Sequence, residues 1–305
     1  MTLLDSTLGA AFLGCIAAAI FYGVTSVQAF IYFQNQRDGK LFQLLIFSLW
    51  VCDSLHLAVT IHGMYWYLVT NFGKLGSIAY PVWSLVAGVY FTNLSDIAVR
   101  GVYSHRLFVL CGRGRRVLRI LLPAIVTTLA VVVFVCGVAF GSFAFELKTF
   151  DRLNHVSILL YLSFAAAVIA DLTVAISLCI LFFRSRTGIK RTDSILSLLM
   201  AFSINTGLLT SLFAIACFVT YALWPSRFVF LGLYFPLSKL YVNSLFASLN
   251  ARQSLRFTKE RLSTEPTANH HDGVSTQIVF PMHSRSSGTA PSGSKTVEGE
   301  DQDAS

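Results

Sequence analysis

Residues Val156–Phe183 read VSILLYLSFAAAVIADLTVAISLCILFF, and residues Arg184–Arg191 read RSRTGIKR. The first stretch carries one charged side chain, Asp171, and exceeds the roughly 20 apolar residues that a helix needs to cross a bilayer core. Basic residues follow it at once, which is typical of the cytosolic end of a membrane span. The pattern predicts a transmembrane helix whose cytosolic end lies just after Phe183.

The rest of the chain repeats this pattern. Hydrophobic residues make up 55% of the sequence and charged residues 12%, with a mean hydropathy of +0.66. Soluble domains are closer to about 25% charged. No segments of about ten alternating residues indicate a barrel, so the spans should be helices. We therefore expect an all-α integral membrane protein with a seven-helix bundle over residues 1–250. The other six spans are Leu8–Phe33, Leu41–Leu68, Ile78–Val99, Ile120–Phe140, Ser194–Trp224 and Phe228–Leu249.

Basic residues indicate the orientation of the bundle. They gather in residues 37–40, 100–119, 184–191 and 252–261, whereas the loops on the other side hold only Lys74, Lys148, Arg152 and Arg227. The positive-inside rule places the N-terminus outside and the C-terminus in the cytosol. Much of the net charge of +8 then faces the anionic cytosolic leaflet. We expect no nucleic-acid partner, because no soluble basic fold is present, and we expect the plasma membrane rather than an internal one.

The composition changes after Asn250. Ala251–Leu262 could form a short amphipathic helix on the membrane surface, with its basic side chains reaching the headgroups. Residues 263–305 are rich in Ser, Thr, Gly and Pro and end in acidic residues. Such a segment buries too little apolar surface to offset its ordering entropy, so we expect a disordered cytosolic tail.

Ionisable residues at bilayer depth are costly, and each is therefore a candidate functional residue. At 1.5 Å per residue, Asp53, Asp171 and Lys239 all fall near the midplane. We expect Lys239 to pair with a carboxylate, Asp171 first and Asp53 second, because a pair largely cancels the buried charge. The cluster serves either to lock the helices together or to bind a ligand or ion. Its candidate members are Asp53, His56, Asp171, Asn205, Lys239 and Asn243.

No catalytic motif stands out, and we expect neither an enzyme nor a bound metal or cofactor. An intramembrane zinc hydrolase would want about three protein ligands. His56 and His62 are on different faces of one span, and no later span offers a third histidine. A retinal protein could use Lys239 as its Schiff base, with Asp96 or Asp53 as counter-ion. The residues before Lys239 lack the aspartate four positions earlier that microbial opsins carry.

Asn93, Asp96 and Arg100 lie at the predicted cytosolic end of the third span. An acid followed by a base at this place is similar to the switch of seven-helix receptors. An ordinary ion pair between Asp96 and Arg100, one helical turn apart, explains the spacing equally well.

Several segments together resemble a fungal multi-pass membrane family labelled domain of unknown function 6534. The resemblance runs from about Gly14 to Arg252 and implies a fungal integral membrane protein, but no activity. The end of the third span, Val102–Arg106, departs from the aromatic-rich pattern expected there. The segments that carry the resemblance are Tyr22–Gln28, Asp53–His56, Arg186–Ile189, Arg191–Ser194, Asn205–Ser211, Lys239–Leu245 and Ala247–Arg252.

These observations favour a receptor-like sensor of a small or lipidic ligand, because the predicted outer loops are too short to form a domain. A transporter or channel that uses Asp53, Asp171 and Lys239 is the first alternative, and a structural or lipid-organising protein is the second. A closed outer cavity would favour the sensor, a continuous polar path the transporter, and a dry interior the structural protein.

Overall fold

The computed structural model describes residues 5–34, 38–111, 116–147, 149, 156–184, 190–225 and 227–264. Within these residues seven helices are long and apolar enough to cross a membrane, and the predicted seven-helix fold is confirmed. They are α1 (Ala10–Gln34), α2 (Lys40–Tyr65), α3 (Trp83–Leu110), α4 (Arg116–Leu147), α6 (Ser157–Arg184), α7 (Lys190–Leu223) and α8 (Val229–Thr264). Short helical turns precede α1 (η1, Asp5–Gly9), extend α2 (η2, Trp66–Thr70) and precede α3 (η3, Leu75–Ala79).

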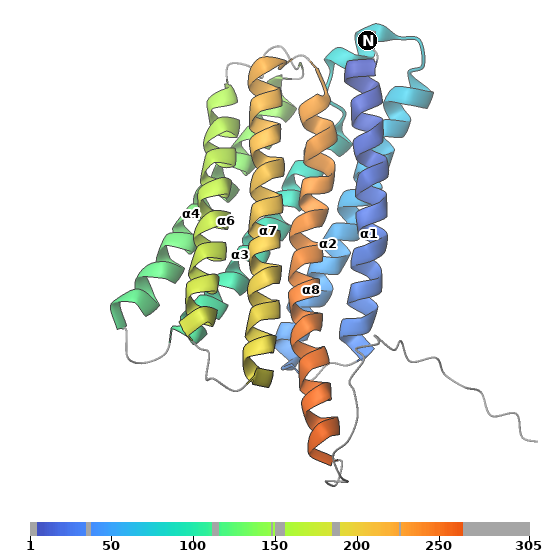
Figure 1. Cartoon of the computed structure of the whole chain (residues 1–305). Helices are drawn as coiled ribbons and strands as arrows, with labels where there is room; N and C mark the ends of the chain where they lie inside the picture. Colours follow the sequence, from blue (N-terminus) through green and yellow to red (C-terminus); the bar gives the residue numbers. More distant parts are fainter. Residues whose placement is uncertain are drawn as a thin grey trace, which may run out of the picture. The chain divides into compact units, whose positions relative to one another are not determined.

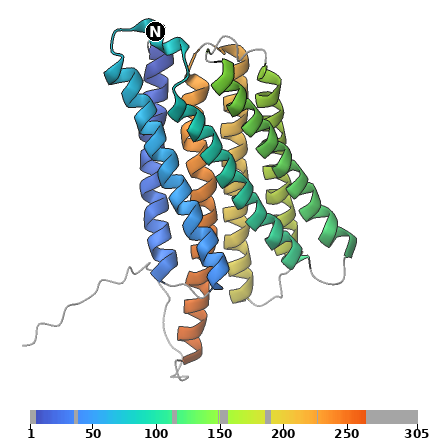
Figure 2. The ribbon, with the colours of Figure 1, turned by 180° about the vertical axis from the view of Figure 1, so that it is seen from behind.

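The seven helices form a closed ring in chain order (Figure 1). Each helix packs on the next one along the chain, and α1 packs on α8 to close the ring. Contacts of α3 with α6 and α8, and of α2 with α8, fill the interior. The view from behind shows α3 crossing the bundle obliquely (Figure 2). We call the end at which α1 begins the N-terminal end, and the end at which α1 finishes the opposite end.

Large apolar side chains cover the outside of the bundle. On α1 alone, Leu13, Ile20 and Phe30 are each at least 64% exposed. A soluble protein would bury such residues, whereas lipid tails solvate them at no cost. The outward faces of the helices are therefore suited to a bilayer.

Close packing of α1 on α8 depends on glycine. A Cβ atom built on Gly14 would lie 2.1 Å from the carbonyl oxygen of Gly232, far inside van der Waals contact. The buried face of α1 continues with the small residues Ala11, Cys15 and Ala18. Small residues let two backbones approach closely, and the van der Waals packing that results is one source of helix–helix attraction in membranes.

Two helices extend beyond the predicted spans. Helix α3 continues to Leu110, where the sequence predicted an end at Val99, so Arg100 lies inside the helix. Helix α8 continues without a break to Thr264, so residues 251–262 prolong a membrane helix rather than form a separate one. The side chains after Ala251, which would form the predicted amphipathic face, lie outside the described residues, as does the predicted tail after Thr264.

Candidate functional site

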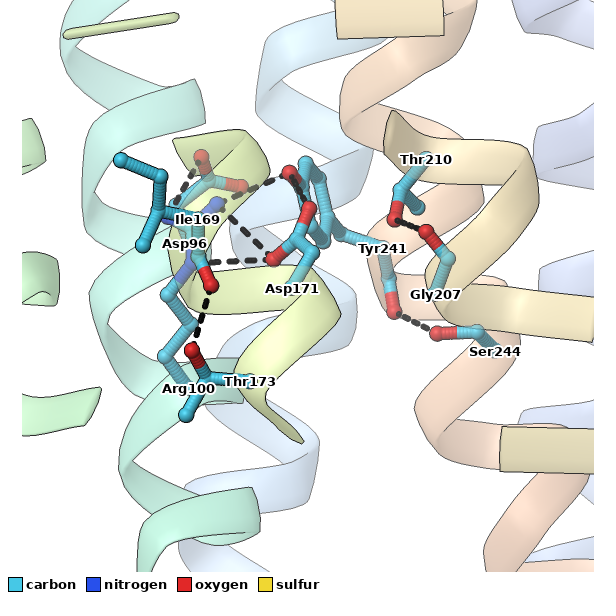
Figure 3. Close-up of polar contacts among 9 residues, drawn as sticks. All are labelled: Asp96, Arg100, Ile169, Asp171, Thr173, Gly207, Thr210, Tyr241 and Ser244. Atoms are coloured by element: carbon cyan, nitrogen blue, oxygen red, sulfur yellow. Dashed lines mark hydrogen bonds and ion pairs between the residues drawn. The ribbon is translucent and has the colours of Figure 1, made fainter. Parts of the chain in front are cut away.

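Arg100 is the centre of a buried polar cluster that joins three helices (Figure 3). Its guanidinium donates to Asp171 Oδ1 of α6 from Nε at 3.3 Å and from Nη2 at 3.2 Å. Nη2 also donates to the Tyr241 hydroxyl of α8 at 2.8 Å, and Nη1 donates to Asp96 Oδ2 of α3 at 3.3 Å. The Tyr241 hydroxyl in turn donates to Asp171 Oδ2. These four residues are called the Arg100 cluster below.

The Arg100 cluster holds two carboxyl groups and one guanidinium. Arg100 is only 2% exposed, so its charge depends on these partners rather than on water. The planar fork of arginine suits this site, because it reaches three acceptors on three helices at once. With both carboxyl groups ionised, the cluster is one positive charge short of neutrality.

A second buried ion pair joins α2 to α8. Lys239 Nζ donates to Asp53 Oδ1 at 2.8 Å and also to the Asp53 carbonyl oxygen. Both side chains are fully buried. The ammonium also lies 5.6 Å from the ring centre of Tyr22 on α1, within the range of a cation–π contact. This pair therefore ties together three neighbouring helices.

The predicted order of partners for Lys239, with Asp171 first, is wrong. Successive helical residues are about 100° apart, so Lys239 and Tyr241 point to nearly opposite sides of α8. Lys239 turns toward α2 and meets Asp53, whereas Tyr241 turns toward α3 and α6 and meets Asp171. The predicted single cluster is consequently two separate clusters.

The other predicted site residues are divided between the protein interior and the surface. His56 is 1% exposed, and its Nδ1 has no hydrogen-bond partner among the described residues. Asn243 is half-buried, one turn after Lys239. Asn205 is exposed on the surface of α7, which removes it from the candidate site. Asn93 is buried, and its amide donates to the Val89 carbonyl at 2.7 Å.

A cavity of about 100 Å³ occupies the half of the bundle nearer the N-terminal end. One water needs only about 10–15 Å³ of such space, so the cavity has room for a small organic group. Apolar residues from five helices form most of its wall, including Val86 of α3, Phe140 of α4, Phe164 of α6 and Phe230 of α8. From Leu85 to Asp96 its wall follows α3 for about 16 Å. We call it the Asp96 cavity.

Asp96 and Tyr241 of the Arg100 cluster line the deep end of this cavity. Asp96 Oδ2 is bonded to Arg100, whereas Asp96 Oδ1 is buried and finds no partner in the described part of the chain. Near the N-terminal end, the buried Tyr221 hydroxyl of α7 likewise has no partner among described residues. A residue at each end of the apolar cavity thus carries a buried polar atom that has no partner among the described residues.

Asn93 also lines the cavity, and a glycine makes room for it. A Cβ atom on Gly137 of α4 would lie 2.1 Å from Asn93 Oδ1. Any other residue at position 137 would displace the Asn93 side chain. The sequence drew attention to Asn93, Asp96 and Arg100 as a group, but it did not indicate a cavity beside them.

A smaller cavity, of about 30 Å³, lies on the other side of the Arg100 cluster. Ser203 and Gly207 of α7 line it together with Arg100, Asp171 and Tyr241. Tyr241 therefore faces both cavities. Residues of the Arg100 cluster thus line both cavities, Asp96 the larger one, Arg100 and Asp171 the smaller one.

Residues 167–254 match a family of unknown function, DUF6534. The matched segment runs from the middle of α6 into α8, and it includes Asp171, Lys239 and Tyr241. It supports the family resemblance in the second half of the bundle and brings no activity with it. Neither a curated protein nor a solved structure matches the chain.

Proposed function

We propose that this protein is a membrane sensor that binds a small, largely apolar molecule in the Asp96 cavity and transmits its presence through the Arg100 cluster. The observation that carries the proposal is the position of Asp96 and Tyr241. Both line the cavity, and both bond to Arg100, which holds α3, α6 and α8 together. A ligand that contacts either residue acts directly on three helices.

The shape of the interior supports binding more strongly than passage. The cavity wall is mostly apolar, and its deep end is closed by the bonded side chains of the Arg100 cluster. Small ligand sites typically have such apolar walls with a few placed polar groups. The polar atoms without described partners on Asp96 and Tyr221, which line the cavity, also favour a bound molecule over the empty apolar space that a purely structural bundle would tolerate.

Helix α8 offers a route by which occupancy would spread. Pro236 lies inside α8, between the cavity residues Phe230 and Tyr241. Proline lacks the N–H that would bond to the Gly232 carbonyl, so the helix is weaker at this turn. A ligand that displaces Phe230 would bend α8 here and shift Tyr241 against Arg100. The opposite end of α3, beyond Arg100, would respond.

The neutral probe 6,6,6-trifluorohexan-1-ol tests the proposal in nanodiscs that contain the purified protein. We expect a protein-bound fluorine resonance and slower hydrogen exchange in α3 from Arg100 to Leu110. Ala167→Phe and, as a second filling variant, Ala144→Leu should abolish both effects, since both alanines line the cavity. Ala165→Phe is the matched control, because Ala165 is exposed on the same helix. Binding without a change in exchange beyond Arg100 would overturn the sensor, and binding that survives both filling variants would overturn the cavity as its site.

The second cavity favours one alternative, a transporter in which the Arg100 cluster opens toward each side in turn. In that case Ala175→Leu, which fills the second cavity, would block the passage of 6,6,6-trifluorohexan-1-amine into sealed liposomes that contain the protein. The sensor predicts no protein-dependent uptake at all. Uptake measured in proteoliposomes therefore separates the two functions.

A further inference from the structure

We infer that the ligand of the Asp96 cavity is a cationic amphiphile, a slender apolar molecule with a protonated amine that binds Asp96 Oδ1. This inference rests on the proposed function, because it specifies the ligand of the same cavity. Three observations carry it: an unpartnered carboxylate oxygen, a local shortage of positive charge, and the length and chemistry of the cavity wall.

The first observation concerns Asp96. Its side chain is only 10% exposed, and Arg100 Nη1 occupies Oδ2 at 3.3 Å. Oδ1 has no hydrogen-bond partner within the described residues, although a carboxylate at this depth normally has every oxygen satisfied. Asp96 lines the cavity, so a molecule bound beside it is the natural source of a donor, which a small rotation of the buried carboxylate would bring to Oδ1.

The second observation concerns charge. Arg100 is the cation of the cluster for two carboxylates, Asp96 and Asp171, and it donates two of its hydrogen bonds to Asp171. Lys239 cannot supply the missing charge, because Asp53 holds it on the other side of α8. An ammonium group at Asp96 Oδ1 would pair with Asp96, while Arg100 pairs with Asp171. The cluster and the ligand together would then be neutral. A carboxylate or phosphate ligand would instead add a second uncompensated charge.

The third observation concerns the rest of the ligand. The cavity extends about 16 Å along α3 beyond Asp96, and its wall holds the aromatic residues Phe140, Phe164 and Phe230. A chain or a narrow ring system would bury its apolar surface there, at roughly 25 cal/mol per Å². At the far end, the unpartnered Tyr221 hydroxyl suits a hydroxyl or carbonyl group on the same molecule.

A matched pair of probes tests the charge of the ligand. In nanodiscs, 6,6,6-trifluorohexan-1-amine and 6,6,6-trifluorohexan-1-ol differ only in the group that would meet Asp96, and fluorine NMR titration gives the affinity of each. We expect the amine to bind wild-type protein at least about tenfold more tightly than the alcohol, as for a hydrogen bond to a charged group. Asp96→Asn should remove this preference, while alcohol binding shows that the variant is folded.

Asp38→Asn is the matched control. It removes the same charge from the chain, but Asp38 lies before α2 at the opposite end, where it accepts a bond from Tyr32. The amine preference should be intact in this variant. Equal affinity for amine and alcohol, or a preference that survives Asp96→Asn, would overturn the inference and leave the proposed function standing. Equal affinity is also the result expected if a proton on Asp96, rather than a ligand, neutralises the cluster. Absence of binding by both probes would overturn the cavity site itself.

Discussion

Replacing Lys239 with methionine removes the cation that the structure pairs with Asp53, while it keeps a side chain of similar length. Both members of the pair are fully buried, so the remaining carboxylate would have neither water nor a counter-charge. Removal of one partner from such a pair costs about 3–5 kcal/mol. The cost should fall at the upper end of this range, because Asp53 Oδ2 already lacks a partner among the described residues.

The double variant Lys239→Met/Asp53→Leu should recover most of that loss, because an apolar pair of similar volume replaces a buried ion pair with little penalty. The expected interaction energy between positions 239 and 53 is about 2–3 kcal/mol. Equilibrium unfolding of the purified protein in micelles, followed by circular dichroism, gives the free energy of unfolding for each variant.

Lys239→Met/Asp171→Leu is the control that distinguishes Asp53, the partner of Lys239 in the structure, from Asp171, the partner that the sequence analysis ranked first. Asp171 bonds to Arg100 and Tyr241, so this substitution should add to the loss rather than repair it. Recovery with Asp171→Leu and none with Asp53→Leu would refute the two-cluster arrangement.

Three further predictions concern packing, the Arg100 cluster and orientation. Gly14→Ala should lower the unfolding free energy by about 1–3 kcal/mol, because its Cβ atom would meet Gly232. Gly23→Ala on the same helix should leave the unfolding free energy unchanged, because that Cβ atom meets nothing within 4 Å. Equal unfolding free energies for the two variants would contradict the close packing of α1 on α8. Tyr241→Phe should cost about 1–3 kcal/mol in the same assay, because Asp171 loses a donor, and an unchanged stability would remove Tyr241 from the cluster. Finally, a protease added to sealed cells should cut a tag placed before Met1 and spare one placed after Asn250, since basic loops stay in the cytosol; protection of the first tag would reverse the orientation.

Much of the fold follows from the sequence, because hydrophobic length is a local property. Each span needs only its own residues to be recognised, as in Val156–Phe183, which agrees with α6 (Ser157–Arg184) to within one residue at each end. The end of α3 was misplaced because Arg100 looks like a terminal charge in sequence. Its burial depends on Asp171 and Tyr241, which are 71 and 141 residues away, and a single sequence does not reveal such partners.

The candidate site was only partly predictable for the same reason. Depth in the membrane can be counted along a helix, and it drew attention to Asp53, Asp171 and Lys239, all of which the structure buries. Depth does not give the direction in which a side chain points around its helix. That direction separates Lys239 from Asp171, and it places Asn205 on the exposed surface of α7. The Asp96 cavity depends on how five helices diverge from one another, so the sequence of any one helix does not indicate it.

An experimental density map of the protein in a bilayer mimic, recorded with 6,6,6-trifluorohexan-1-amine, would test the central claim most directly. The account predicts a slender density between α3, α4, α6 and α8, with the amine nitrogen within hydrogen-bond distance of Asp96 Oδ1 and the trifluoromethyl group toward Phe140 and Phe230. A map in which apolar side chains fill this space, or in which the amine binds only at the lipid-facing surface, would contradict it.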